Sequence, residues 1–208
     1  MLLELMQSRR SIRKFLPKVP ERALLKRLIE AAVTAPSASN KQPWRFFIVH
    51  NSEVKARMAA AIREAVERVA AHIEPQFETA FRAYGDYFTR FETAPVVIVP
   101  LYRPLTLLSS MVGPNLLPKD RKNVICMEEQ SGLVSTSLAV ENLLLMAHEV
   151  GLGASGLTGP LIAADELREI LSVPASWNIV ALVAVGYPDE QPMPTGRKAA
   201  ENVTRWIA

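Results

Sequence analysis

Three short apolar runs, separated by longer segments of helical periodicity, constrain the fold of this chain most strongly. The runs are RFFIVH at 45–50, PVVIVPLY at 95–102 and NIVALVAVG at 178–186. Each has the length and the β-branched content of a buried strand. Apolar residues recur at helical spacing over 20–34, 52–72, 124–150 and 164–172. This order predicts helices and strands that alternate in one mixed fold, with no internal repeat.

Two further segments interrupt this pattern of helices and strands. Residues 103–123 contain Pro104, Gly113, Pro114 and Pro118, which favour a loop or lid over a long helix. The closing segment 187–208 is rich in proline up to Pro194, so we expect it to be extended and free to lie on another subunit. With 208 residues, of which 49% are apolar, the chain can fill one sizeable core, so we expect one domain over 1–208.

Aromatic residues gather between 77 and 91, spaced by threes and fours as on one helix face. Two interpretations stay open, because such a stripe can pack a helix onto the core or line an apolar pocket. The members are Phe77, Phe81, Tyr84, Tyr87, Phe88 and Phe91.

Composition excludes several classes of function. The net charge is only +3, which gives little electrostatic support for binding nucleic acid. Cys126 is the single cysteine, so no disulfide can form within the chain and a reducing cytoplasm fits best. No apolar run reaches the roughly 18 residues that a membrane helix needs. The histidines lack the spacing of metal ligands, so we expect no metal site.

Two polar segments could bind a ligand. RRSIRKF at 9–15 gathers basic side chains around Ser11 and can hold a phosphate, although a solvated basic turn has the same composition. APSASNKQPWRFF at 35–47 presents short polar side chains between prolines. Such a stiff loop can hydrogen-bond a flat heterocycle, or it can simply use Ser and Asn for turn geometry.

GLGASG at 151–156 matches the dinucleotide fingerprint G-x-G-x-x-G in an unsuitable context. That fingerprint follows a strand, opens a helix and has an acidic residue roughly 20 positions on. Here a long helical pattern precedes the glycines and Ser176 stands at that distance. We expect these glycines to cap the helix and to let backbone N–H groups approach a ligand.

Taken in order, four motifs resemble the nitroreductase family over about residues 3–207. They are the R-x-S-x-R start, the A-P-S-x-x-N-x-Q-P-W loop, the helix that ends in A-x-x-x-G-L-G, and the late G-Y-P followed by an arginine. The resemblance implies an α+β fold with a mixed sheet flanked by helices in an intertwined homodimer. It also implies FMN in a cleft built from both subunits, and it makes 75–123 an insertion that covers the cleft.

The resemblance also implies which residues bind FMN. The arginines at the start and Arg197 would face its phosphate and ribityl chain, except that Arg13 would lie near N1 of the ring. Residues of the loop would come from the second subunit, and backbone groups at 156–159 would face N5. Thr158 departs from relatives with Glu or Gly there, which affects substrate preference more than FMN binding. The full set is Arg9, Arg10, Ser11, Arg13, Pro36, Ser37, Ala38, Asn40, Gly156, Leu157, Thr158, Gly159 and Arg197.

The implied reaction uses FMN N5 as the reactive atom and requires no catalytic side chain. NADH or NADPH would supply a hydride, and a small planar acceptor such as a nitroaromatic or a quinone would take two electrons. Three alternatives stay open at this point. They are an FMN-binding protein without turnover, a specialised chemistry such as reductive dehalogenation or flavin fragmentation, and a basic adaptor that grips phosphorylated partners.

Overall fold

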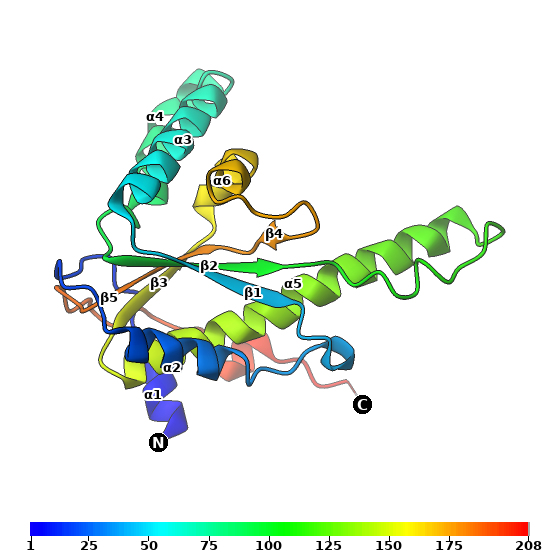
Figure 1. Ribbon diagram of the computed structural model, residues 1–208, viewed down its shortest axis with the longest axis horizontal. Helices are drawn as coiled ribbons and strands as arrows, with labels where there is room; N and C mark the ends of the chain where they lie inside the picture. The colour runs from blue at the N-terminus through cyan, green and yellow to red at the C-terminus, as the bar shows by residue number, and fades with distance from the viewer. Residues whose placement is uncertain (208) are drawn as a thin grey trace.

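The computed structural model describes residues 1–207 and places helices on both faces of one sheet (Figure 1). The strands are β1 (Trp44–Val49), β2 (Val96–Tyr102), β3 (Gly153–Leu157), β4 (Asn178–Ile179) and β5 (Leu182–Gly186). The α-helices are α1 (Leu2–Ser8), α2 (Arg22–Ala32), α3 (Ser52–Ala70), α4 (Pro75–Gly85), α5 (Pro118–Glu149) and α6 (Ala164–Ile170). Short 3₁₀ turns span Ala38–Asn40, Asp86–Thr89, Gly159–Ala163 and Ala200–Val203.

The sheet has the order β1-β2-β5-β3, and β4 pairs with β2. All these ladders are antiparallel, and a parallel bridge joins Ser11 to Ala154. The α+β class expected from the resemblance is therefore confirmed. The run 178–186 is not one continuous strand as expected, because it splits into β4 and β5 opposite Pro100. Pro100 has no N–H to donate, and its carbonyl accepts from Val180 N at 2.9 Å outside either strand.

Strand β2 is the centre of the fold because both of its faces are buried. Side chains alternate between faces along a strand, and Val97 and Val99 accordingly pack in the apolar cluster with α3 and α6. Val96 and Ile98 pack in a second cluster with α2 and α5. The molecule thus has three layers, with the sheet between two groups of helices (Figure 1).

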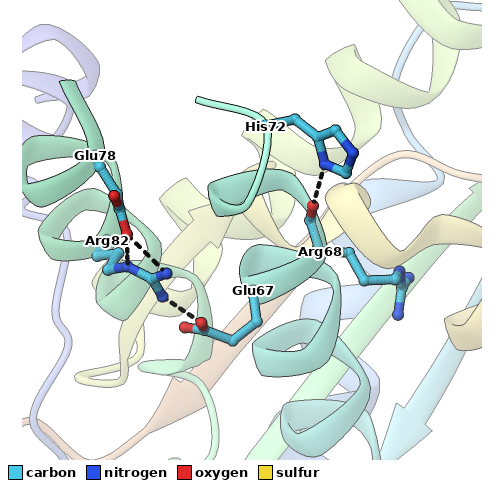
Figure 2. A network of polar contacts seen from close by, with 5 residues as sticks. All are labelled: Glu67, Arg68, His72, Glu78 and Arg82. Carbon is cyan, nitrogen blue, oxygen red and sulfur yellow. Dashed lines mark hydrogen bonds and ion pairs between the residues drawn. The ribbon is translucent and has the colours of Figure 1, made fainter. Parts of the chain in front are cut away.

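Helix α4 packs beside α3, and ion pairs reinforce the contact (Figure 2). Arg82 on α4 pairs with Glu67 on α3, and its Nε donates to Glu78 at 3.0 Å. The aromatic stripe does not form one helix face as expected, because α4 ends at Gly85 and a 3₁₀ turn follows. Its later members Phe88 and Phe91 enter the core, and Phe77, Tyr84 and Tyr87 are exposed.

Helix α5 starts at Pro118, earlier than the 124 expected, so the loop covers 103–117 only. Its small buried residues let it cross the sheet closely, and a Cβ at Gly132 would collide with the carbonyl oxygen of Arg103. The N-terminal part of α5 projects beyond the sheet, and the 103–117 segment runs back along it (Figure 1). Helix α1 was not expected, because a short helix with Leu2, Leu3 and Met6 exposed carries no buried stripe that periodicity could reveal.

Candidate functional site

The arginine segment lies beside the glycine-rich strand β3, more than a hundred residues away in the chain. Ile12 N donates to Ala154 O at 3.1 Å, and Ser11 forms the parallel bridge with the same residue. Ile12 is buried against Gly153, where a Cβ would lie 2.7 Å from the Ile12 side chain. Glycine is therefore required at 153 for the two segments to approach this closely.

The guanidinium groups of this segment are available to an anion. Arg9 and Arg10 are half-buried, and Arg13 is exposed. Arg10 donates to Gln7 O at 2.6 Å and Arg13 to Ser11 O at 3.3 Å, both of which are neutral carbonyls. Among the salt bridges within residues 1–207, no carboxylate pairs with any of the three.

Arg9 and Arg10 line a cavity of about 420 Å³ together with residues that sequence reasoning did not select. His148, at the end of α5, contacts Ser8 Oγ through Nε2 at 2.8 Å in this cavity. Glu190 closes another side, where its carboxylate accepts from Arg13 N at 2.5 Å. No motif around His148 or Glu190 signals this role, because only the tertiary fold carries them to the cavity.

The glycine-rich segment 151–159 was expected to cap α5 and to expose backbone N–H groups, and most of it forms the strand β3. Gly151 does cap α5, with a φ of 77° that favours glycine, and Leu152 N donates to Ala147 O at 2.8 Å. From Gly153 onward the chain pairs with β5. The capping prediction is therefore confirmed at Gly151, and the strand that follows was not predicted.

Near its end, at Gly156, strand β3 lies on an open surface. A Cβ at Gly156 would meet no atom within 4 Å, and Gly156 and Thr158 are exposed. Leu157 is half-buried. Gly159 faces inward instead, because a Cβ there would collide with the ring of Phe88. Gly156 thus presents bare backbone on the strand that also pairs with the arginine segment, and Thr158 lies exposed just beyond the end of that strand.

The loop 36–42 is strained. Ser39, Asn40 and Gln42 have φ values of 50°, 51° and 47°, a region that costs a non-glycine residue roughly 1–2 kcal/mol. Asn tolerates this region best, so the strain concentrates at Ser39 and Gln42. The loop is held by Ala38 N, which donates to Ser135 Oγ at 3.2 Å, and by Gln42 N, which donates to Ser37 Oγ at 3.0 Å. Strain of this kind is concentrated at functional sites.

The loop and the arginine segment do not meet within one chain. The loop contacts α5 at Ser135, whereas Arg9 and Arg10 share a cavity with His148 on the same helix. Thirteen residues of α-helix separate these points by about 20 Å. Pro36, Ser37 and Ala38 instead line an apolar groove of about 550 Å³ along the exposed side of α5. Asn40 is exposed in the same loop.

Arg197 makes no hydrogen bond to the other predicted site residues within 1–207. Its guanidinium donates to Thr195 Oγ1 at 2.6 Å and to Gly196 O at 3.2 Å, and the side chain is exposed. These contacts are local and neutral, so they leave its charge free for a ligand. The surrounding segment has no regular secondary structure over 191–199, and a 3₁₀ turn follows at 200–203.

Glu128 anchors the 103–117 segment to α5. This buried carboxylate accepts from the N–H of Leu108 at 2.5 Å and of Ser109 at 3.3 Å. Hydrogen bonds from Ser109 and from these amides lower the pKa of Glu128, because they favour its charged form. Over residues 1–207 we find no group of three or more His, Cys, Asp or Glu that could hold a metal ion. No helix in the described part of the chain is long and apolar enough to cross a membrane.

Two curated proteins resemble this chain over most of its length. An NADH dehydrogenase of Thermus thermophilus is 32% identical, over 95% of this chain and 92% of that protein. An iodotyrosine deiodinase of Haliscomenobacter hydrossis is 30% identical, over 91% of this chain and 80% of that protein.

Solved structures share the fold. A BluB-like flavoprotein of Clostridium difficile superposes with a TM-score of 0.87 at 22% identity, over 100% of this chain and 99% of that one. Oxidised iodotyrosine deiodinase bound to FMN and 3-iodo-L-tyrosine superposes with a TM-score of 0.74 at 23% identity, over the whole of both chains. The model of the nitroreductase family matches residues 6–187. With its motifs, its fold and its relatives in agreement, the chain belongs to the nitroreductase family.

Proposed function

We propose that this protein is an FMN-dependent oxidoreductase that uses NADH or NADPH to reduce a small planar acceptor by two-electron transfer. One observation carries the proposal. The hydrogen bond from Ile12 N to Ala154 O sets the arginines of 9–13, which have no carboxylate partner within residues 1–207, beside the strand that carries the bare backbone of Gly156. A phosphate and a flat ring, joined by a short chain, are the ligand parts that such an arrangement fits.

The residues around Gly156 and the arginine segment fit FMN. The absence of any atom within 4 Å of a Cβ at Gly156 leaves room for a ring edge against backbone. Arg9 and Arg10 can pair with a terminal phosphate, and the positive charge of Arg13 can stabilise negative charge on the ring. The amide at Thr158 can orient the ring edge. FMN, when bound, supplies the hydride-accepting centre, and this chain supplies binding, orientation and charge.

The same site requires a second copy of the chain. The cavity of Arg9 and Arg10 meets α5 at His148, about 20 Å along that helix from the loop contact at Ser135, so a partner's loop would complete the cleft. Exposed apolar residues mark the contact surface of this homodimer. They include Met127, Val134 and Leu138 on α5. Arg197 would reach the phosphate from the exchanged C-terminal segment, whose Trp206 is 92% exposed.

We place the whole cleft in one domain over 1–208, with 75–123 as the segment that shapes the substrate pocket. Glu128 supports this role for the 103–117 part, because it fixes the backbone of Leu108 and Ser109. Tyr84 and Tyr87 are exposed, although Tyr84 packs edge-on against Phe88 and Arg90 stacks on Tyr87, and their outer surfaces would contact a substrate or a partner subunit. The exposed thiol of Cys126 fits a reducing compartment such as the cytoplasm.

A second candidate is reductive dehalogenation of a halogenated aromatic compound. The 30% identity to an iodotyrosine deiodinase favours it. Both reactions need reduced FMN, so the acceptor and not the cofactor distinguishes them.

An anaerobic titration tests the proposal. Purified protein should carry a flavin absorbance spectrum, the released chromophore should be FMN, and NADH or NADPH should bleach the spectrum. Reoxidation by a nitroaromatic, a quinone or 3-iodotyrosine then ranks the acceptors. A protein that binds no FMN after reconstitution refutes the cofactor assignment, and FMN that neither nucleotide reduces refutes the reductant.

A further inference from the structure

A basic concavity lies at the end of the sheet, next to the strained loop. Its volume is about 540 Å³, and it lies between the 39–41 turn, the 103–107 segment and the turn before β4. Lys41 and Arg103 supply its charge, and Ser39, Thr106 and Ser176 supply hydroxyl groups. Among the residues of 1–207 that line it, none is acidic.

The cations around this concavity have no carboxylate partners. Within the part of the chain that the structure describes, the salt bridges involve neither Lys41, Arg103 nor the neighbouring Arg45. Glu128 contacts the same 103–117 segment, but the amides of Leu108 and Ser109 already engage its carboxylate. The positive charge is therefore uncompensated.

Packing holds two of these cations, Arg45 and Arg103, in place. The guanidinium of Arg45 lies 4.4 Å from the ring centre of the buried Trp177, and that of Arg103 lies 5.8 Å from it. Stacking on an indole restricts the guanidinium and leaves its N–H edges free. Arg168 fixes the backbone turn before β4, because it donates to Pro174 O at 3.4 Å and to Ala175 O at 3.3 Å.

We propose that this concavity is an anion-binding subsite for a phosphate group of the nicotinamide dinucleotide. The inference rests on the proposed function, because it places the hydride donor at the cleft that Ser39 adjoins. A guanidinium fork, an ammonium group and hydroxyl donors around one open volume suit a phosphate oxygen cluster. The subsite is separate from Arg9, Arg10 and Arg13, which we assign to FMN.

Titration calorimetry on the FMN-loaded protein tests the subsite without turnover. The probes are adenosine 2′,5′-bisphosphate, which carries the 2′-phosphate of NADPH, and ADP-ribose, which carries the pyrophosphate of both nucleotides. Lys41→Ala and Arg103→Ala should each weaken binding about tenfold, the effect of losing one charge-assisted contact. Arg57→Ala removes an exposed charge on α3 and serves as the matched control.

The outcomes separate the possible sources of the phosphate. Weaker binding of the bisphosphate alone assigns the subsite to the 2′-phosphate, and weaker binding of ADP-ribose as well assigns it to the pyrophosphate. Unchanged affinities in both variants, or no binding of either probe to the wild type, overturn the subsite. Circular dichroism of each variant checks that it folds. Reduction of wild-type FMN by NADH or NADPH, followed in a stopped-flow instrument, tests the proposed function separately.

Discussion

The substitution Gly156→Ala separates the stability of the fold from the binding of FMN. Gly156 lies in β3 opposite Val183, its φ is not positive, and a Cβ would meet no atom within 4 Å. Alanine therefore fits the backbone of the isolated chain. It also reduces the conformational entropy of the unfolded state, which stabilises a protein by about 0.4–1 kcal/mol at a compatible site. For a chain of this size we expect the Tm of the apoprotein to rise by about 1–4 °C.

The same methyl group should weaken FMN binding. If the ring edge lies against the backbone at 156, the added carbon occupies space that the ring needs. Overpacking of a close contact costs about 1–3 kcal/mol, which corresponds to about a five- to 150-fold larger Kd. The substitution should therefore change stability and affinity in opposite directions, which general damage to the fold cannot do.

Two measurements on one preparation decide the matter. Thermal unfolding is recorded on apoprotein, so that ligand binding does not shift the Tm. The Kd for FMN is measured by fluorescence titration. Gly113→Ala is the control, because a Cβ there also meets no atom within 4 Å and the position is outside β3. An FMN affinity equal to that of the wild type, together with the higher Tm, would refute the placement of the ring against Gly156.

Three further predictions test other parts of the site. Gly153→Ala should lower the free energy of unfolding by about 1–3 kcal/mol and weaken FMN binding, because the added Cβ would lie 2.7 Å from Ile12. Urea unfolding and FMN titration measure the two effects, and an unchanged stability together with an unchanged Kd would contradict the reasoning. Arg197→Ala should weaken FMN binding about ten- to 150-fold by loss of one charge-assisted contact, with the Tm of the apoprotein unchanged and Arg205→Ala as the control; equal dissociation constants would show that the phosphate lies elsewhere. The lowered pKa of Glu128 means that its contribution to stability is present above its ordinary pKa of 4.5 and is lost as the pH falls through the lower folded value. Limited proteolysis of the 103–117 segment should accordingly accelerate only in acid, and in Glu128→Gln it should be fast already at neutral pH; equal rates in both proteins would exclude Glu128 as the anchor.

Local patterns of apolar residues in the sequence were enough to predict the deeply buried helices and strands. Strands β1 and β2 were predicted within one residue at either end, because continuous apolar runs bounded by turn residues have few alternative structures. Helices α2, α3 and α6 were likewise found, since each carries an apolar stripe or a clear start and stop. The motifs also pointed to the family and to the arginines, because these depend on residue type and spacing alone.

Other features were decided by contacts between distant parts of the chain. The division of β4 from β5 depends on which strand lies opposite Pro100, and the strand conformation of the glycine-rich segment depends on pairing with β5. Neither partner can be read from the segment itself. The short helix α1 lacks a buried face of its own and was missed for that reason.

The site shows the same division between local and distant information. The residue types in the sequence pointed to Arg9, Arg10 and Arg13 as ligands of a phosphate. Only the bridge from Ser11 to Ala154 sets these arginines beside β3. The strain at Ser39 and the stacking of Arg45 and Arg103 on Trp177 have no signature in the sequence. Positive φ angles and ring contacts arise when loops close against a finished sheet. Periodicity reports which face of an element is buried, whereas the tertiary structure decides what that face meets.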